Sequence, residues 1–482
     1  MVELNYFPKN KSKIFFVGIK GTGMAALAAL LKTKDYFVYG SDVGEPFFTD
    51  LILSKYNIDF DVDFSIDALD DTYDFVIYSA AYDVDSHPQL LKASELKIPM
   101  AVYPQALGLL SKESYFVGVA GIHGKTTTTA LIGTLIKNTP LQASVLAGSI
   151  VSQFDNSPVL TQGEELFVAE TCEYRRHFLF FDPNVVLITS LEEDHLDYFK
   201  DLDDIKDAFL SYCQKIPKGG SVIYYGDSQN VISFIESLSS LRPDLRLIPY
   251  GYSCNSLYTI TSTEFESGQF TFQLVNFNKL WTLAVPGRHN ILNATAALAV
   301  ITELYKYKEL KIESSTLDSW HNSLISFKGT KRRSEVIGEA CGILFMDDYG
   351  HHPTALKTTI EGVREFYPDR RIVVDFMSHT YSRTISLFDE FAQAFSSADV
   401  VILHKIYASA RETQGTIRGQ DLYHKTKEYH NSVYYEEEPL ESIKLVTDIL
   451  KSGDLFLTMG AGNNWELGQA LYKLYSSKES IN

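Results

Sequence analysis

Residues 115–136 read YFVGVAGIHGKTTTTALIGTLI, and this stretch decides how the chain is interpreted. It begins as a short apolar run typical of a buried strand, continues as a glycine-rich loop and ends as an apolar segment of helical character. Such a loop turns several backbone N–H groups toward one point at the start of a helix. Together with Lys125 and the hydroxyl of Thr126, these groups predict a site for nucleotide phosphates and magnesium. The sequence therefore indicates that the chain uses ATP.

The loop departs from the general phosphate-binding pattern at one position. Val119 stands where the leading glycine is expected, five residues before Gly124, and glycines occupy positions 118 and 121 instead. The alternative interpretation is a plain glycine turn between strand and helix. The order Gly-Lys-Thr after a strand favours the phosphate site.

Composition limits the class of protein. The chain has 482 residues, of which 45% are apolar, so about three domains are expected. No apolar run approaches the roughly eighteen residues of a membrane span, and the first residues lack a secretory pattern. With 43 basic against 61 acidic residues, the formal net charge is −18. We therefore expect a protein that neither inserts into a membrane nor binds nucleic acid.

Cysteine usage indicates a reducing compartment. Cys172, Cys213, Cys254 and Cys341 lie far apart and lack the spacing of a zinc site or a disulfide framework. A cytoplasmic location is therefore expected. The sequence predicts no oligomeric state.

Strand and helix patterns predict an α/β fold with three domains. Their expected limits are residues 1–110, 111–322 and 323–482. The first is expected to be Rossmann-like, the second a P-loop ATPase-type domain with a mostly parallel sheet, and the third again Rossmann-like. Closure of the third domain is expected about a hinge near residues 322–330.

The first unit carries a second glycine loop. Strand 13–17 leads into GIKGTG at 18–23, and a further strand at 37–40 ends at Ser41 and Asp42. The spacing G-x-x-G-x-G is not the dinucleotide fingerprint, which favours a nucleotide-diphosphate site over a NAD site. Candidate ligand residues at these strand ends, of which the last three have a plain turn as the alternative, are Gly18, Gly21, Thr22, Gly23, Ser41, Asp42, Ser79, Ala80 and Ala81.

Several further polar residues follow predicted strands. Glu170 and His195, with Thr126, are candidates to surround one magnesium ion, although spacing alone favours a structural histidine because magnesium prefers oxygen ligands. Asn290 has an N-cap as its simplest interpretation. Arg332 and Arg333 fit either a phosphate or ordinary surface charge.

The carboxylates Asp347 and Asp348 suit ribose hydroxyls or a cation. The adjacent His351 and His352 would point apart in any regular element, which argues against a metal bound by this pair.

Six motifs occur in order along the whole chain. They are GIKGTGM at 18–24, GIHGKTT at 121–127, EDHLD at 193–197, GRHNILNA at 287–294, KRR at 331–333 and DDYGHHP at 347–353. The chain thereby closely resembles the Mur ligase family, in the branch that adds alanine. DDYGHHP is the most specific motif, and segments 378–384 and 407–412 support it.

This resemblance implies an activity and its ligands. The domains would bind UDP, ATP and the amino acid in that order. The reaction would join L-alanine to the lactyl carboxylate of UDP-N-acetylmuramate, through an acyl phosphate, with ATP and Mg²⁺, in peptidoglycan precursor synthesis.

The resemblance also assigns roles to residues. Lys125, Glu170 and His195 would be catalytic, and Thr126, Glu170 and His195 would hold the metal. The implied ATP contacts are Gly121, His123, Gly124, Lys125, Thr126, Thr127, Asn290, Arg332, Arg333, Asp348 and Tyr349. His123 would also touch the UDP substrate, and His352, His379 and Arg383 would lie on the amino-acid side.

Three departures and three rival functions remain. Glu173 competes with Glu170 as the metal ligand, and Asn463 and Asn464 replace the Asp-Ile that many relatives carry. Residues 210–212 hold no lysine where sister ligases have a carbamylated one, which fits the alanine branch. The rivals are a tripeptide-recycling Mur ligase, a nicotinamide-dependent oxidoreductase and a noncatalytic nucleotide sensor.

Overall fold

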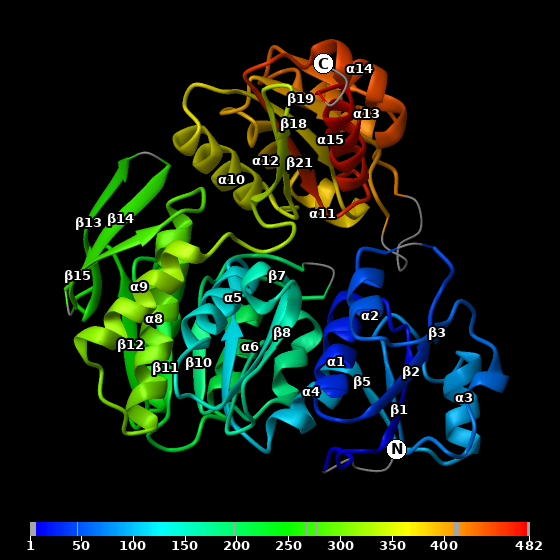
Figure 1. Ribbon diagram of the computed structural model, residues 1–482, viewed down its shortest axis with the longest axis vertical. Coiled ribbons are helices and arrows are strands. Elements are labelled where there is room, and N and C mark those ends of the chain that lie inside the picture. Colours follow the sequence, from blue (N-terminus) through cyan, green and yellow to red (C-terminus); the bar gives the residue numbers. More distant parts are fainter. Residues whose placement is uncertain are drawn as a thin grey trace.

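Three separate sheets, each built from its own part of the chain, organise the molecule (Figure 1). The computed structural model describes residues 6–45, 47–195, 198–266, 268–275, 277–408 and 415–479. The C-terminal part lies at the top of Figure 1, above the central part at lower left and the N-terminal part at lower right. The predicted α/β class with three units is confirmed.

The N-terminal sheet is entirely parallel, in the order β3-β2-β1-β4-β5. Its strands are β1 (Lys13–Val17), β2 (Phe37–Ser41), β3 (Phe60–Asp61), β4 (Phe75–Tyr78) and β5 (Met100–Val102). Its helices are α1 (Thr22–Thr33), α2 (Asp50–Lys55), α3 (Pro88–Glu95) and α4 (Tyr103–Ser111). The order reverses at β1, and such a switch point is where ligands bind in open parallel sheets.

The central sheet has ten strands in the order β15-β14-β13-β12-β11-β10-β6-β9-β7-β8. Its strands are β6 (Tyr115–Ala120), β7 (Ala143–Val151), β8 (Ser157–Thr161), β9 (Leu166–Glu170), β10 (Val185–Ile188), β11 (Ser221–Tyr225), β12 (Arg246–Gly251), β13 (Tyr258–Glu266), β14 (Gln269–Leu274) and β15 (Phe277–Leu283). Its helices are α5 (Lys125–Ile136), α6 (Leu202–Cys213), α7 (Gln229–Leu241), α8 (His289–Tyr307) and α9 (Ser314–Ser326), with 3₁₀ turns at Ser152–Phe154 and Tyr174–Phe180.

Both edges of the central sheet are antiparallel, which the strand assignments from sequence missed. β8 pairs antiparallel with β7, and β13, β14 and β15 form an antiparallel ribbon. Residues 258–261 alternate apolar and polar side chains, the pattern of a half-buried strand, before the register shifts at Ser262. That signal was present in the sequence; the core of the sheet, from β12 to β7, is parallel as expected.

The C-terminal sheet has the order β16-β17-β21-β18-β19-β20, with only β16 antiparallel. Its strands are β16 (Glu335–Ala340), β17 (Ile343–Asp348), β18 (Arg371–Met377), β19 (Val400–Leu403), β20 (Val433–Tyr435) and β21 (Asp454–Gly460). Its helices are α10 (Pro353–Phe366), α11 (Tyr381–Ser386), α12 (Phe388–Gln393), α13 (Gly419–Thr426), α14 (Ile443–Ile449) and α15 (Trp465–Glu479).

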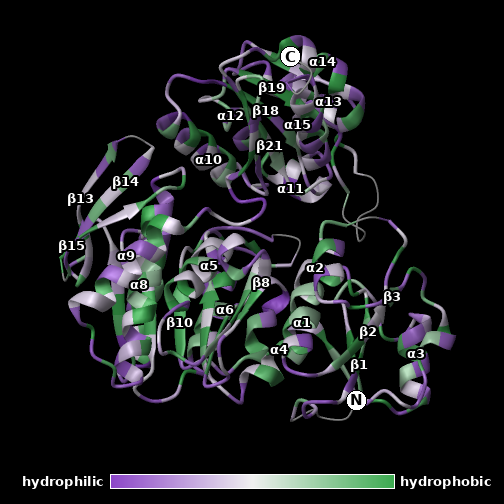
Figure 2. Cartoon of the chain, in the orientation of Figure 1, coloured by the Kyte–Doolittle hydropathy of each residue, from purple (hydrophilic) through white to green (hydrophobic). Residues whose placement is uncertain are grey.

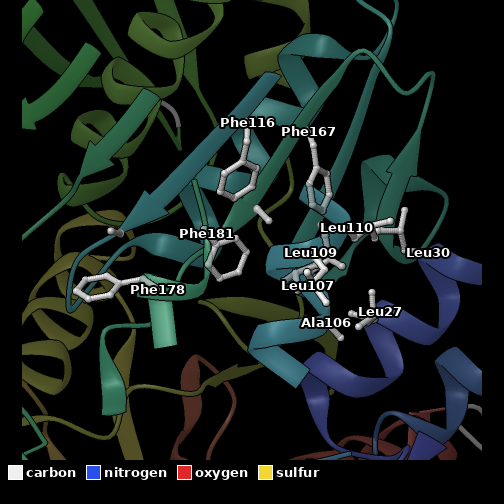
Figure 3. Packing of buried hydrophobic residues seen from close by; sticks show 14 of the residues in the cluster. Leu27, Leu30, Ala106, Leu107, Leu109, Leu110, Phe116, Phe167, Phe178 and Phe181 are labelled. Carbon is white, nitrogen blue, oxygen red and sulfur yellow. The ribbon is translucent and has the colours of Figure 1, made fainter. Parts of the chain in front are cut away.

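The buried apolar clusters do not correspond one to one with the three sheets. Hydrophobic residues are concentrated in the strands and in the covered helices α5 and α8 (Figure 2). One buried cluster runs without interruption from the N-terminal sheet into the central one, whereas the C-terminal sheet has clusters of its own on its two faces. In Figure 3, leucines of α1 and α4 lie near Phe116 and Phe167 of the central sheet.

The domain limits proposed from sequence stay predictions. Residue 322 lies inside α9, and α4 ends at residue 111. Residues 196–197, in the EDHLD motif, and 409–412, in the segment 407–412, lie outside the described residues. Among the described helices, none is long and apolar enough to cross a membrane.

Candidate active site

The glycine loop joins β6 to α5 as the sequence predicts. Gly121 and Gly124 have φ angles of +125° and +83°, a backbone region that side-chain-bearing residues rarely adopt. A Cβ at position 124 would also lie 2.8 Å from Asn293 Oδ1. No side chain caps α5, so the N–H groups of its first turn are available to an anion.

A cavity of about 590 Å³ lies between this loop and the C-terminal domain. Its walls come from the glycine loop, the ends of β9 and β10, the start of α8, and the chain that follows β17 and β18. Fourteen of the residues proposed from sequence line it: His123, Gly124, Lys125, Thr126, Thr127, Glu170, His195, Asn290, Arg333, Asp348, Tyr349, His352, His379 and Arg383. Segments as far apart in the sequence as His123 and Arg383 thus meet at one cavity.

Glu170 ends β9 beside the loop. Its Oε2 accepts a hydrogen bond of 3.0 Å from the Thr126 hydroxyl, and its Oε1 accepts one from Gly148 N–H. Burial raises the pKa of Glu170, and the Gly148 N–H and the charge of Lys125 offset this only in part. A buried carboxylate with too little positive charge around it fits a site for a cation.

Glu173 lies on the other side of the lysine. Its Oε2 is 3.1 Å from Lys125 Nζ, and its Oε1 is 3.7 Å from His195 Nε2. Burial works against the charge on Lys125, but Glu173 outweighs that effect and raises the pKa of the ammonium. The lysine is therefore charged and held at the cavity wall.

The two arginines of the KRR motif have different surroundings. Arg332 is buried and does not line the cavity. Its Nε donates a hydrogen bond of 3.0 Å to Asp347 Oδ2, and its Nη2 donates one of 2.8 Å to the Gly460 carbonyl. Arg333 lines the cavity. The guanidinium groups of both arginines lie over the Tyr349 ring, at 5.0 Å for Arg332 and 5.3 Å for Arg333. Arg333 is thus the one of the pair that can reach a ligand there.

The chain after β18 brings a second cationic group to the cavity. Arg383 on α11 donates 3.0 Å to Asp194 Oδ1 of the central domain, and both side chains are about nine-tenths buried. Against the effect of burial, His195 and Arg383 hold the pKa of Asp194 well below its usual value. The ring of His379 lies 5.9 Å from that of His351.

Models of three families match successive parts of the chain. The Mur ligase family catalytic domain matches residues 13–115, the Mur ligase middle domain 119–301, and the Mur ligase glutamate ligase domain 332–462. A UDP-N-acetylmuramate–L-alanine ligase of Treponema pallidum (strain Nichols) is 46% identical over 98% of both chains. One of Desulfitobacterium hafniense is 40% identical over 95% of this chain and 99% of its own.

The chain belongs to the Mur ligase family.

Solved Mur ligase structures share the fold over nearly the whole length. A UDP-N-acetylmuramate–alanine ligase of Thermotoga maritima superimposes with a TM-score of 0.78 at 24% identity, covering 97% of this chain and 99% of its own. A murein peptide ligase of Psychrobacter arcticus gives 0.68 at 22% identity, covering 96% and 99%.

Asn290 of this Mur ligase is not the cap of α8, so the N-cap interpretation was wrong. The cap is Arg288, and Asn290 lies in the first turn, where its Nδ2 donates 2.6 Å to the Pro286 carbonyl. Asn293 Nδ2 donates 2.9 Å to Asn290 Oδ1, and Thr128 donates 3.2 Å to Asn293 Oδ1. The pair ties the start of α8 to the helix that follows the glycine loop.

The N-terminal candidates gather at one edge of their sheet. β2, β1 and β4 are adjacent and parallel, so Ser41, at the end of β2, lies beside Gly18 and Ser79, which follow β1 and β4. Gly18 has φ +82°, and a Cβ there would lie 2.6 Å from the Tyr82 ring. These candidates do not line the cavity of the other two domains, and neither does Gly121 or Arg332.

Asp42 is part of a buried network at this edge. It accepts 2.6 Å from Lys20 N–H and 2.8 Å from Val43 N–H, and burial raises its pKa. Lys20 is buried too, with its Nζ 2.8 Å from the Glu45 carbonyl and above the Phe60 ring.

Several residues of the site received no role from the sequence. Glu192 and Asp194 stand in or beside the EDHLD motif, and Asn293 stands in GRHNILNA, so the motifs themselves held the signal. Lys20 stands inside the GIKGTG motif, and Tyr82 had no signal beyond its closeness to the end of β4.

Proposed function

We propose that the chain joins L-alanine to the lactyl carboxylate of UDP-N-acetylmuramate, using ATP and forming an acyl phosphate. The observation that carries this is the cavity in which the glycine loop of the central domain faces Arg333, Asp348 and Arg383 of the third. The names of relatives that are 46% and 40% identical over nearly their full lengths support the same reaction.

The chemical problem is that a carboxylate is a poor acyl donor. Its oxygen first attacks the γ-phosphorus of ATP, which gives an acyl phosphate and ADP. The neutral amine then attacks the acyl carbon, the amine loses a proton, and inorganic phosphate leaves with the former carboxylate oxygen. Negative charge shifts in both steps, and preorganised positive groups lower the barrier.

The groups available for this charge are Lys125 and the N-terminus of α5. In the structure Lys125 is paired with Glu173. We propose that the phosphates take over this lysine and leave Glu173 beside His195, whose Nε2 lies 3.7 Å from Glu173 Oε1. Arg333 approaches from the third domain.

The implied magnesium ion fits the residues present. The Thr126 hydroxyl and Glu170 supply the oxygen ligands that this ion prefers, and we propose His195 as the third ligand. Bound there, the ion neutralises phosphate charge. Glu173 remains the alternative carboxylate.

The amino acid is proposed to lie beside α11. Arg383 offers a guanidinium for its carboxylate, with His379 and His352 on the same wall of the cavity. The UDP part is proposed to bind at the edge formed by Gly18, Ser41, Asp42 and Ser79, with His123 reaching it from the glycine loop.

The decisive assay measures phosphate release with ATP, Mg²⁺, UDP-N-acetylmuramate and each amino acid in turn. We expect release that requires both the sugar nucleotide and L-alanine. Release with a tripeptide but not with L-alanine would establish the recycling ligase instead. Binding of ATP without any turnover would support a sensor, and oxidation of NADH would support a dehydrogenase.

The cavity between two domains also supports closure of the third domain around the nucleotide, about the chain near residues 322–330. X-ray scattering should show a smaller radius of gyration with ATP analogue, sugar nucleotide and Mg²⁺ than without them. Superimposable profiles would contradict closure and leave the ligase reaction untouched.

A further inference from the structure

Three side chains outside the proposed magnesium site converge on one wall of the cavity. His123 comes from the glycine loop, Glu192 follows β10, and His352 is the N-cap residue of α10. One potential ligand atom from each lies within 4.8 Å of the others. The first two belong to the central domain and the third to the C-terminal domain, so the cluster bridges the domain junction.

The two imidazoles have nitrogen atoms without hydrogen bonds. Nε2 of His123 and Nε2 of His352 are both buried and lack a hydrogen-bond partner in the described part of the chain. The closest charged group to the first is Glu192 Oε2, at 3.7 Å. The two rings lie 5.3 Å apart and are tilted by 49°. Buried polar atoms normally find a partner, and these two nitrogens both lie beside the Glu192 carboxylate, where a cation could bind all three groups.

The protonation states suit a metal. Burial and the neighbouring His123 lower the pKa of His352 to about 4, so its imidazole is neutral at pH 7. The carboxyl group of Glu192 is ionised at pH 7, because the ordinary pKa of a glutamate, about 4.3, lies far below that pH. Neutral imidazole and carboxylate are the forms that bind metal ions.

We propose that His123, Glu192 and His352 form a site for a zinc-like transition-metal ion that links the central and C-terminal domains. Two nitrogen ligands and one carboxylate match the preference of zinc and not that of magnesium, which selects oxygen. Water from the cavity completes the coordination. The site is separate in its residues from Thr126, Glu170 and His195, and does not depend on the proposed reaction.

Coordination requires small movements. Ligand atoms around one tetrahedral zinc lie about 3.4 Å apart, so the three side chains must approach by up to about 1.4 Å. Because His352 is on the other domain, metal binding draws the two domains together. It also places the imidazole proton on Nδ1 of His352, which ends the 3.3 Å hydrogen bond from Thr354 N–H that caps α10. That bond is long, and its loss is the cost of the site.

Zinc binding to the whole protein tests the proposal, with saturating Mg²⁺ and no substrates. A chromogenic chelator competes for the metal and reports stoichiometry and affinity, and Co²⁺ in place of Zn²⁺ gives a visible spectrum that reports tetrahedral geometry. We expect one equivalent of Zn²⁺, bound with an affinity that saturating Mg²⁺ does not change.

Two variants remove ligands while preserving the fold. His352→Asn keeps a good capping residue for α10 but has no imidazole, and Glu192→Gln removes the carboxylate charge. Each should weaken zinc binding by at least about tenfold. His424→Gln, on the exposed face of α13, is the matched control and should bind as the wild type does.

The opposite results are equally clear. If His195→Gln abolishes binding and His352→Asn does not, zinc occupies the proposed magnesium site and the proposal is wrong. It is also wrong if Mg²⁺ displaces the zinc, or if the protein binds no zinc at all. None of these results bears on phosphate release with L-alanine.

Discussion

The two junctions between domains differ in the polarity of the side chains that form them. Between the N-terminal and central domains the core of the contact is apolar: Leu27, Leu30, Leu107 and Phe167 belong to one buried cluster (Figure 3). A few polar contacts, such as the ion pair Lys34–Glu164, lie beside this cluster. Between the central and C-terminal domains, a cavity of about 590 Å³ is bordered by charged and polar side chains. Apolar contact survives there mainly where Phe366 meets Phe265 and Phe270.

This difference teaches which part of the molecule is suited to move. An apolar core resists separation because every exposed Å² of its surface costs free energy. An exposed ion pair such as Arg288–Glu365 can exchange its partner for water at little cost. The buried pair Asp194–Arg383 lines the cavity, where a charged ligand can take the place of one partner. The first junction therefore fixes one domain to another, and the second can open around reactants.

The largest expected effect concerns the lysine at the polar junction. Lys125→Ala should fold but lose about 10²–10³-fold in the rate of phosphate release, because a positive group that stabilises the shifting charge is gone. The matched control Lys218→Ala, in an exposed turn, should keep the wild-type rate. Wild-type turnover by Lys125→Ala would show that the cavity is not the site of phosphoryl transfer.

At the apolar junction the effect should be on stability. Leu107 is 1% exposed, and Leu107→Ala should lower the free energy of unfolding by about 2–5 kcal/mol. Urea unfolding measures this, with Leu241→Ala as the control at a leucine that is 56% exposed. Equal midpoints for the two variants would mean that this junction does not hold the domains together.

The C-terminal domain should carry its own pH dependence. His404 Nε2 lies 2.6 Å from Asp375 Oδ2, and neither side chain is exposed. Burial disfavours the charged imidazole, but Asp375 outweighs burial and raises the pKa of His404. A histidine whose pKa is higher in the folded than in the unfolded protein stabilises the fold. This contribution to the free energy of unfolding is complete below the unfolded pKa of about 6.5 and is lost as the pH rises through the folded pKa.

Thermal unfolding should therefore begin at lower temperature at pH 9 than at pH 6, by a few degrees. The decrease in unfolding temperature between pH 6 and pH 9 should be smaller in His404→Gln than in the wild type. In the exposed control His424→Gln it should equal the wild-type decrease. A wild-type midpoint as high at pH 9 as at pH 6 would argue against a charged imidazole in the fold.

The smallest effect is expected where an ion pair crosses the polar junction. Glu365→Gln breaks the contact with Arg288, whose side chain is 54% exposed, and should change the free energy of unfolding by less than about 1 kcal/mol. Urea unfolding beside Leu107→Ala makes the comparison direct. A loss as large as that of the leucine variant would erase the distinction between the two junctions.

The sequence predicted local structure better than it predicted contacts between distant parts of the chain. Local patterns were sufficient for the parallel strands and for the glycine loop, since β6, Gly124 and α5 are adjacent in the chain. The family motifs brought Arg333, Asp348 and Arg383 into one expected site, and these residues do line the cavity. The roles of these residues remain predictions.

The sequence could not predict which side chains from distant segments contact one another. Nothing in KRR distinguishes Arg332, whose guanidinium is buried against Asp347 and Gly460, from Arg333. Asn290 looked like a helix cap because the true start of α8 depends on how Gly287 turns, at φ +91°. The convergence of His123, Glu192 and His352 requires the tertiary fold, because 160 residues separate the last two.

An isotope transfer tests the central claim most directly. UDP-N-acetylmuramate carrying ¹⁸O in its lactyl carboxylate is incubated with the protein, ATP, Mg²⁺ and L-alanine, and the released phosphate is analysed by mass spectrometry. The account predicts one ¹⁸O atom in each phosphate, because the carboxylate oxygen leaves with the phosphorus that activated it. Unlabelled phosphate, or none at all, would contradict it.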